Sequence, residues 1–370
     1  MNQEKYLTLH EIVKAARLNL DQGLWDYLIG GSETETSLKR NRQALDSLAF
    51  RPRVLHDVSE LDASSSFLGH PLRIPVLLAP IGSLQAFEAG GGASAAKAAE
   101  IFGTINILSS ACKPDLETVA DASNSAKMYQ LYLLGDDAWM DQMINRAIDA
   151  GYVALCLVPD MVVYSRRERD LAKRFLPPTR RKDGHQTGGN DLEANFGFQA
   201  KLSWDTVKRV KDRYPIPLVL KGIATAEDAG LACEHGVEVI YVSNHGGRQL
   251  DHGRGTIDML PEIVREVNGR ASIVVDGGFM RGTDVVKGIA LGADAVGIGK
   301  LEGLAMAADG VNGVVRALEL LELEIQNCLA MLGVTRLDQL NPSYLCNAKA
   351  VGFSDATSAF PLLNLEDAGY

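Results

Sequence analysis

Short apolar runs rich in β-branched residues recur along the chain, and each run ends in a polar or glycine cluster that precedes a helical stretch. This alternation is typical of a parallel sheet that helices cover. It predicts eight strands, at Val76–Ala79, Asn106–Ser109, Lys127–Tyr132, Val153–Val158, Leu218–Lys221, Val239–Ser243, Ile273–Asp276 and Ala295–Ile298. Because a closed barrel needs eight strands, we expect an α/β fold of the (β/α)8 TIM barrel type.

Helical spacing is clear in the segments between the predicted strands. Apolar residues lie three and four positions apart within 138–150, and Gly151 follows as a suitable helix end. Thr225 precedes two acidic residues, Glu227 and Asp228, which is the pattern of an N-cap and a first helical turn. These segments therefore favour helices packed outside a barrel.

Three parts of the chain fall outside the regular alternation, within what we expect to be a single domain spanning 1–370. Residues 71–322 are expected to form the barrel. Before it, residues 1–70 are expected to form an N-terminal helical extension, in which helices at 7–45 can cap the lower end of the barrel. Residues 176–200 are polar and glycine-rich and predict a long mobile loop after strand 4, either a lid or a disordered excursion. Residues 323–370 continue a long helix and end in a tail.

Composition narrows the class of protein. Hydrophobic residues make up 46% and charged residues 23%, which is globular, and the net charge of -10 argues against a nucleic-acid surface. The five cysteines are odd in number and lack CxxC spacing, so we expect neither a disulfide framework nor a metal site. A charged amino terminus and the lack of an eighteen-residue apolar run predict a cytoplasmic protein without a membrane partner.

Polar residues stand at nearly every predicted strand end. In a TIM barrel the active site forms at the carboxyl ends of the strands, so these side chains are expected to converge. They are Ser109, Gln130, Tyr132, Asp160, Lys221, His245, Asp276 and Lys300.

The densest group of such residues is the nonapeptide 243–251, SNHGGRQLD, directly after an apolar strand. His245 can remove a proton near neutral pH, and Arg248 can place two hydrogen bonds on a carboxylate. Glycines between them let the backbone turn closely around a ligand. A lone histidine is more often a hydrogen-bonded core residue, but the complete nonapeptide favours a catalytic one.

This nonapeptide resembles the signature of the FMN-dependent 2-hydroxy acid oxidase and dehydrogenase family, the group that contains glycolate oxidase, lactate oxidase and mandelate dehydrogenase. Matching motifs follow in the same order along nearly the whole chain. They are Trp25-Asp26-Tyr27, Arg51-Pro52-Arg53-Val54-Leu55, Leu108-Ser109-Ser110, Gln130-Leu131-Tyr132, Arg166-Arg167-Glu168, Leu202-Ser203-Trp204, Lys221-Gly222 and Asp276-Gly277-Gly278.

The resemblance implies roles for individual residues. His245 would be the base that takes the proton from the substrate hydroxyl or alpha carbon, with Asp160 orienting and charging it, while Tyr132 and Arg248 complete the catalytic set. The substrate would be bound by Tyr27, Tyr132, Arg167 and Arg248. FMN would be bound at Ser109, Gln130, Lys221, Ser243, Asp276, Gly278, Arg281, Gly299 and Lys300.

The chain departs from the family pattern at the phosphate end. Met280 and Lys300 stand where the family has arginines, and Lys300 keeps a charge without the bidentate fork. Arg281 is adjacent to Met280 and can substitute for it. Val158 stands where the family has a hydroxyl residue that touches the flavin.

The activity that the resemblance implies is oxidation of an (S)-2-hydroxy acid to a 2-oxo acid by FMN, with O2 as acceptor, H2O2 as product and a homotetramer or homo-octamer as the assembly. Two alternatives stay open. One is a barrel lyase or isomerase in which Lys221 forms a Schiff base. The other is a catalytically silent flavin or metabolite binder, which the departures at Met280, Lys300 and Val158 would suit.

Overall fold

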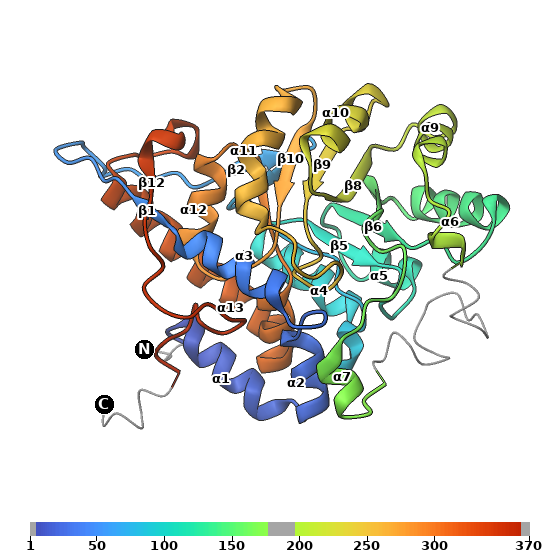
Figure 1. Ribbon diagram of the computed structural model, residues 1–370, viewed down its shortest axis with the longest axis horizontal. Coiled ribbons are helices and arrows are strands. Elements are labelled where there is room, and N and C mark those ends of the chain that lie inside the picture. Colours follow the sequence, from blue (N-terminus) through green and yellow to red (C-terminus); the bar gives the residue numbers. More distant parts are fainter. Residues whose placement is uncertain (1–4, 177–196, 364–370) are drawn as a thin grey trace.

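Eight parallel strands close into a barrel in the computed structural model of the chain, which describes residues 5–176 and 197–363 (Figure 1). The strands lie in the order β10-β11-β4-β5-β6-β7-β8-β9, and β9 pairs with β10. Their bounds are β4 Val76–Leu78, β5 Asn106–Ser109, β6 Lys127–Leu131, β7 Ala154–Leu157, β8 Leu218–Ile223, β9 Val239–Val242, β10 Ser272–Val275 and β11 Ala295–Ile298. The predicted strands and the predicted barrel are therefore confirmed.

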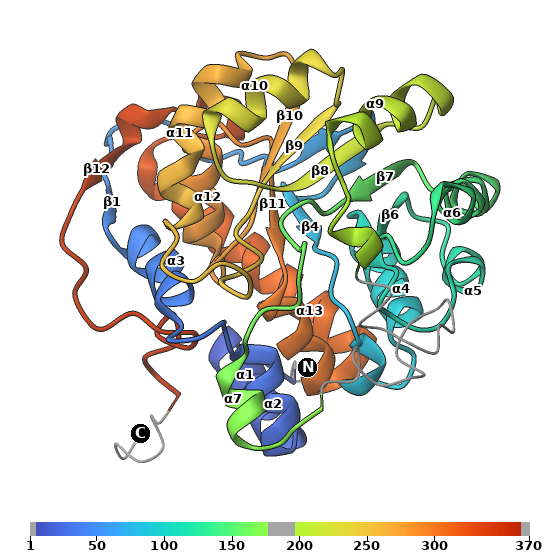
Figure 2. The ribbon, with the colours of Figure 1, turned by 45° about the vertical axis from the view of Figure 1, so that its right-hand side comes forward.

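Helices surround the strands on the outside of the barrel (Figure 2). The segment 138–150 forms α6 as predicted, and the Thr225 hydroxyl accepts a hydrogen bond from the Asp228 backbone N at 3.2 Å at the start of α10. The helices around the barrel are α4 Gly92–Phe102, α5 Leu116–Asp121, α6 Asp137–Asp149, α9 Trp204–Arg213, α10 Ala226–Glu234, α11 Thr256–Val267, α12 Gly282–Ala290 and α13 Lys300–Leu332. The short helix α7 Glu168–Ala172 packs against α2.

Alternate residues of each strand face opposite sides of the barrel wall, because side chains of a strand alternate between its two faces. In β9, Val239 and Tyr241 belong to the apolar cluster inside the barrel, whereas Ile240 and Val242 pack under the helices. The same alternation places the polar residue that follows β9, Ser243, on the interior side. Strand parity thus decides which polar residues at the strand ends face the centre.

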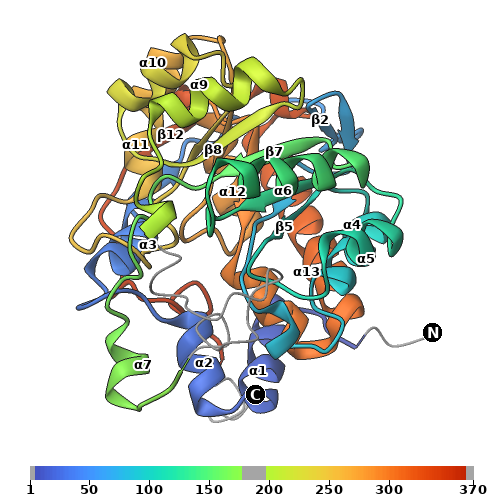
Figure 3. The ribbon, with the colours of Figure 1, turned by 90° about the vertical axis from the view of Figure 1, so that its right-hand side faces the viewer.

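The amino-terminal helices lie at the carboxyl ends of the strands, and not at the lower end where the sequence placed them. They are α1 Leu9–Asn19, α2 Gln22–Ile29 and α3 Thr36–Asp46. Asn41 of α3 exchanges two hydrogen bonds of 2.8 Å with Asn244, and Ser37 N donates to Asp251 at 2.7 Å, so α3 packs on the loop after β9. Figure 3 shows α1, α2 and α7 grouped together on one side of the barrel. The sequence pattern identified these helices but carried no signal of this tertiary position.

Two small antiparallel sheets complete the described structure. The hairpin of β2 Ser65–Phe67 and β3 His70–Leu72 precedes the amino end of β4 and adds Phe67 and Leu72 to the interior cluster. Strand β1 Leu48–Phe50 pairs with β12 Leu345–Asn347 beyond the end of α13, and short 3-10 turns lie at Leu84–Ala86, Leu337–Gln339 and Pro342–Tyr344. Helix α13 continues past residue 323 as predicted, with non-helical angles at Asp309 and Gly310.

Most of the predicted loop at 176–200 lies outside the described residues, as do 1–4 and the end of the tail. Within the described ranges, no helix is both long and apolar enough to cross a bilayer. Across those same ranges, histidine, cysteine, aspartate and glutamate side chains form no cluster of three that could hold a metal ion.

Candidate active site

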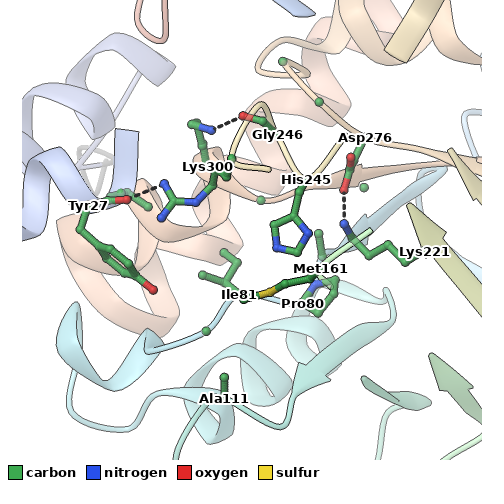
Figure 4. A pocket seen from close by; sticks show the side chains of 18 of the residues that line it. Tyr27, Pro80, Ile81, Ala111, Met161, Lys221, His245, Gly246, Asp276 and Lys300 are labelled. Carbon is green, nitrogen blue, oxygen red and sulfur yellow. Dashed lines mark hydrogen bonds and ion pairs between the residues drawn. The ribbon is translucent and has the colours of Figure 1, made fainter. Parts of the chain in front are cut away.

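A pocket opens at the carboxyl ends of the barrel strands, between these ends and the amino-terminal helices (Figure 4). It contains about 1080 Å³ of space between protein atoms, part of it open to solvent. Predicted site residues that line it are Tyr27, Tyr132, Arg167, Lys221, His245, Arg248, Asp276, Gly278, Gly299 and Lys300. The fold therefore brings together residues that are far apart in the sequence.

His245 and Asp160 form a hydrogen-bonded pair beside this pocket. His245 Nδ1 lies 3.2 Å from Asp160 Oδ1, and its backbone N donates to Ser243 Oγ at 3.0 Å. The backbone of His245 is left-handed, with φ 58, and Figure 4 shows its ring among the pocket residues near Pro80 and Met161. Burial lowers the pKa of His245 below its ordinary value, although Asp160 opposes this shift. The imidazole is therefore neutral at pH 7 and able to accept a proton.

Gly222 gives Asp160 the space it needs. Its φ is 118, which favours glycine, and a Cβ added there would lie 2.5 Å from Asp160 Cγ. In the Lys221-Gly222 pair, Lys221 therefore supplies a cation inside the barrel, and Gly222 lets the backbone lie close to the Asp160 carboxylate.

Arg248 joins the loop after β9 to the end of α2. Its Nη1 donates to the backbone oxygens of Tyr27 at 2.6 Å and Gly30 at 2.9 Å, and the guanidinium lies 5.0 Å from the centre of the Tyr27 ring. These contacts fix one edge of the guanidinium against the protein. Burial, with a contribution from Arg167, lowers the pKa of Arg248 to about 10, so it is charged at neutral pH.

Arg167 contributes a second cation to the pocket, from the residue that precedes α7. Its Nη1 donates to Tyr164 Oη at 2.9 Å, and its guanidinium lies 4.4 Å from the centre of the Tyr164 ring. Its buried Nε has no hydrogen-bond partner among the described residues. Two arginines in one pocket are suited to bind a ligand carboxylate.

Lys221, Ser243 and Asp276 form a buried polar group at the ends of three neighbouring strands. Lys221 Nζ donates to Ser243 Oγ at 3.0 Å and lies 3.2 Å from Asp276 Oδ2, while Ser243 Oγ donates to Asp276 Oδ1 at 2.6 Å. Burial alone would lower the pKa of Lys221, but Asp276 and Asp160 outweigh it and raise the pKa. Lys221 is therefore an ammonium ion, whereas Schiff-base chemistry needs a neutral amine.

Ser109 and Gln130 lie on the interior parity of β5 and β6. Ser109 Oγ donates to Gln130 Oε1 at 2.6 Å, and the Gln130 side chain is fully buried. Its amide nitrogen, Nε2, has no hydrogen-bond partner among the described residues. Because leaving a buried donor unpaired is costly, this amide fits a ligand that accepts a hydrogen bond, such as the polar edge of a flavin.

The loops after β10 and β11 form the other end of the pocket. Gly277 and Gly278 have φ values of 98 and 86, and a Cβ added to Gly299 would meet only Ala79 Cβ, at 4.0 Å. A TIM barrel binds phosphate with glycine amides of these two loops and a helix N-terminus. The backbone here therefore suits the phosphate of FMN.

Arg281 does not join this end of the pocket. Its guanidinium forms hydrogen bonds with Glu324 of α13, at 3.0 and 3.1 Å from Nε, and donates from Nη1 to Ala359 O at 3.2 Å. Met280 does line the pocket, as does Lys300, whose Nζ donates to Gly246 O at 2.9 Å. The expected substitution of Arg281 for the missing arginine is thus not observed.

Several pocket residues were not singled out from the sequence. They are Leu28, Pro80, Ile81, Gly82, Phe87, Ala111, Met161 and Tyr164. Pro80 and Ile81 follow the first barrel strand, so the strand-end argument could have found them, and Met161 is adjacent to Asp160. Phe87 and Leu28 depend on tertiary packing and gave no signal in the sequence.

The fold and the site define a barrel with a hydrogen-bonded histidine–aspartate pair, two arginines in one pocket and glycine-rich loops at its strand ends. A family model described as FMN-dependent dehydrogenase matches residues 16–347. The chain belongs to this family, which confirms the resemblance seen in the motifs. It is accordingly a flavoprotein oxidoreductase whose cofactor is FMN.

Individual relatives agree with this assignment over nearly their whole length. An L-lactate oxidase of Nostoc sp. is 38% identical, over 92% of this chain and 98% of the relative. A peroxisomal (S)-2-hydroxyacid oxidase of Arabidopsis thaliana is 34% identical, over 92% of this chain and 97% of the relative. Among solved structures, a mandelate oxidase has a TM-score of 0.85 at 34% identity, covering 94% of this chain and 100% of its own. An (S)-mandelate dehydrogenase has a TM-score of 0.86 at 32% identity, covering 93% and 100%.

Proposed function

We propose that the protein oxidises an (S)-2-hydroxy acid to the corresponding 2-oxo acid and passes the electrons to O2, which becomes H2O2. The observation that carries the proposal is the pairing of His245 with Asp160 in one pocket with Arg167 and Arg248. A base beside two cations suits a substrate that carries a carboxylate next to the carbon to be oxidised. The names of the relatives, which include lactate, glycolate and mandelate oxidases, support the same chemistry.

In this proposal the two arginines hold the substrate carboxylate, and the phenols of Tyr27 and Tyr132 line the same space. Burial raises the pKa of Tyr132, so its phenol remains protonated and able to donate a hydrogen bond. His245 takes the proton from the substrate hydroxyl or alpha carbon. Asp160 then stabilises the imidazolium ion that forms, since the carboxylate lies beside Nδ1.

FMN, when bound, supplies the acceptor for the electron pair that leaves the alpha carbon. Lys221 provides a fixed positive charge at the flavin ring, which favours an electron-rich ligand. Ser109, Gln130 and Ser243 offer hydrogen bonds to the ring, and Asp276 holds Lys221 in place. Gly278, Gly299 and Lys300 are assigned to the phosphate.

The assembly and the compartment are part of this proposal. The family resemblance implies a homotetramer or homo-octamer, which gel filtration with light scattering can measure on the full chain. The cytoplasmic location stays a prediction of the sequence.

The experiment that tests the proposal is an absorption spectrum of the purified protein, followed by anaerobic addition of single 2-hydroxy acids. We expect an oxidised flavin band near about 450 nm that one (S)-acid bleaches, while its (R)-enantiomer leaves the band unchanged. Admission of air should then restore the band and release H2O2.

Other outcomes separate the alternatives. A yellow protein that no hydroxy acid bleaches would support the silent flavin binder. A colourless protein that FMN does not reconstitute would overturn the oxidase proposal.

A further inference from the structure

The segment between β7 and α7, residues 158–167, carries Asp160 and contains neither helix nor strand. Its one local backbone hydrogen bond is long, from Met161 N to Val158 O at 3.5 Å. Such a segment does not fix the position of a carboxylate by itself, because regular backbone hydrogen bonds do not hold it. Other groups must therefore keep Asp160 beside His245.

Gln249, in the loop after β9, bonds to this segment from outside. Its Nε2 donates to the backbone oxygens of Asp160 at 3.1 Å and of Val163 at 3.0 Å. Among the described residues, no backbone N–H donates to either oxygen. The Gln249 side chain is buried, so loss of its amide would leave two carbonyl groups without this donor. Gln249 therefore closes the turn 160–163.

The Asp160 side chain is confined on its other side by β8. A Cβ added to Gly222 would lie 2.5 Å from Asp160 Cγ, so the backbone of Gly222 already contacts the carboxylate group. This contact blocks movement of Asp160 toward the strand. Movement of the turn 160–163 is then the main way in which the carboxylate could leave His245, 3.2 Å from it.

A second side chain joins the same two segments at a different point. Ser165 Oγ donates to Arg248 O at 2.5 Å, so it links the residue before Gln249 to the far part of the irregular segment. This bond lies outside the turn that carries Asp160. Ser165 is therefore a matched comparison, because both side chains bond to backbone oxygen of the opposite segment but only Gln249 bonds at Asp160.

The protonation of His245 depends on how closely Asp160 is held. Burial is the largest cause of the lowered pKa of His245, and the positive charges of Lys221 and Arg167 act in the same direction. Asp160 opposes them through its charge and its hydrogen bond. Both contributions weaken as the two groups move apart, so a looser Asp160 leaves His245 with a lower pKa.

We propose that Gln249 is a positioning residue that holds Asp160 against His245 by bonding to the backbone of the turn 160–163. This inference rests on the roles that the proposed function gives to His245 and Asp160. Gln249 is not among the described residues that line the pocket, so it acts through these neighbours and not on the substrate. A carboxylate held in advance does not have to move when the imidazolium ion forms.

The test follows the protonation of His245 without the need for turnover. Diethyl pyrocarbonate acylates neutral imidazole, so its rate of reaction at residue 245 reports the neutral fraction from about pH 4.5 to about pH 7.5. The rate is measured by mass spectrometry on the flavin-loaded full chain. In Gln249→Met the profile should move to lower pH by about half a unit. Ser165→Ala should keep the wild-type profile, because the turn of Asp160 retains its donor.

A shorter amide gives a second variant of the same position. Gln249→Asn can reach one of the two oxygens at most, so its profile should move in the same direction by a smaller amount. This variant decides the question if Gln249→Met does not fold. Where a hydroxy acid is turned over, kcat of Gln249→Met should fall by about tenfold, less than in Asp160→Asn, while KM changes little.

An unmoved profile in the Gln249 variants would overturn the inference. An equal shift in Ser165→Ala would overturn it too, because the effect would then come from general loosening of the two segments. The proposed oxidation is judged separately, by bleaching of the flavin with a hydroxy acid. A protein that shows the shift and resists bleaching would retain the assignment of Gln249 and lose the proposed function.

Discussion

The two ends of the pocket are built in different ways. At the proposed substrate end the side chains have fixed partners, as in the His245–Asp160 pair and the contacts of Arg248 with α2. At the proposed phosphate end, glycine backbone and Lys300 line the pocket, while the nearby Arg281 is turned to Glu324. Under the proposed function, this difference predicts that substitutions at the substrate end reduce activity more than a substitution of Arg281 reduces FMN binding.

The largest effect is expected from removal of the base. His245→Gln should reduce kcat by about a thousandfold or more, because a general base contributes on the order of 10² to 10⁴ and its partner Asp160 would lose its function too. FMN content should remain unchanged. Steady-state kinetics on the hydroxy acid that bleaches the flavin will measure this, with His252→Gln, at an exposed position of the same loop, as the control. Comparable losses in both variants would show that the loop, and not the base, is at fault.

Loss of the orienting carboxylate should have the next largest effect. Asp160→Asn should reduce kcat by about a hundredfold, since the imidazolium ion loses its counter-charge. Asp160 raises the pKa of His245, so its removal should lower that pKa further. Because the base works when deprotonated, the acidic limb of kcat/KM should move to lower pH, which a profile from about pH 4.5 to pH 8 will resolve. An unmoved limb would contradict the assigned pairing.

Substrate binding should respond to the shape of Arg248. Arg248→Lys keeps a charge but cannot hold both backbone oxygens of α2 and a carboxylate, so KM should rise by about 10- to 100-fold. The matched control is Arg254→Lys, whose side chain pairs with Glu262 at the surface of the same segment. If KM is unchanged in Arg248→Lys, this arginine does not bind the substrate.

The smallest effect is expected at the phosphate end. Arg281→Gln should leave the dissociation constant of FMN unchanged and cost about 1 kcal/mol of stability, since it removes a partly exposed ion pair with Glu324. Urea unfolding and flavin fluorescence will separate the two quantities. The comparison variant is Arg270→Gln, which removes an exposed ion pair between Glu266 of α11 and a residue just after this helix. A loss of FMN affinity above tenfold would mean that Arg281 reaches the phosphate after all.

The barrel could be predicted because its information is local. Each strand is an apolar run with its own end signal, and strand parity then turns Lys221, Ser243 and Asp276 toward the centre. The expectation of polar residues at strand ends also identified His245 and Gln130. Their positions follow from the local pattern of one strand and do not depend on contacts with distant segments.

What could not be predicted depends on contacts between distant segments. Asn41 meets Asn244, 203 positions away, and Arg42 meets Asp284, 242 positions away, so the place of α3 follows from pairings that no local pattern records. The contacts of Arg281 could not be predicted for the same reason, because its partner Glu324 is on another helix, α13. Sequence reasoning identified this arginine as a charge near the phosphate but could not see that the charge was already neutralised.

The pocket draws on both ends of the polypeptide, from Tyr27 in α2 to Lys300 in α13. A nascent chain on the ribosome therefore has no complete site until its last barrel strand and the helix after it have left the exit tunnel. The complete FMN site can therefore form only after synthesis of the barrel. A chain truncated before residue 300 would lack part of the pocket that we assign to FMN.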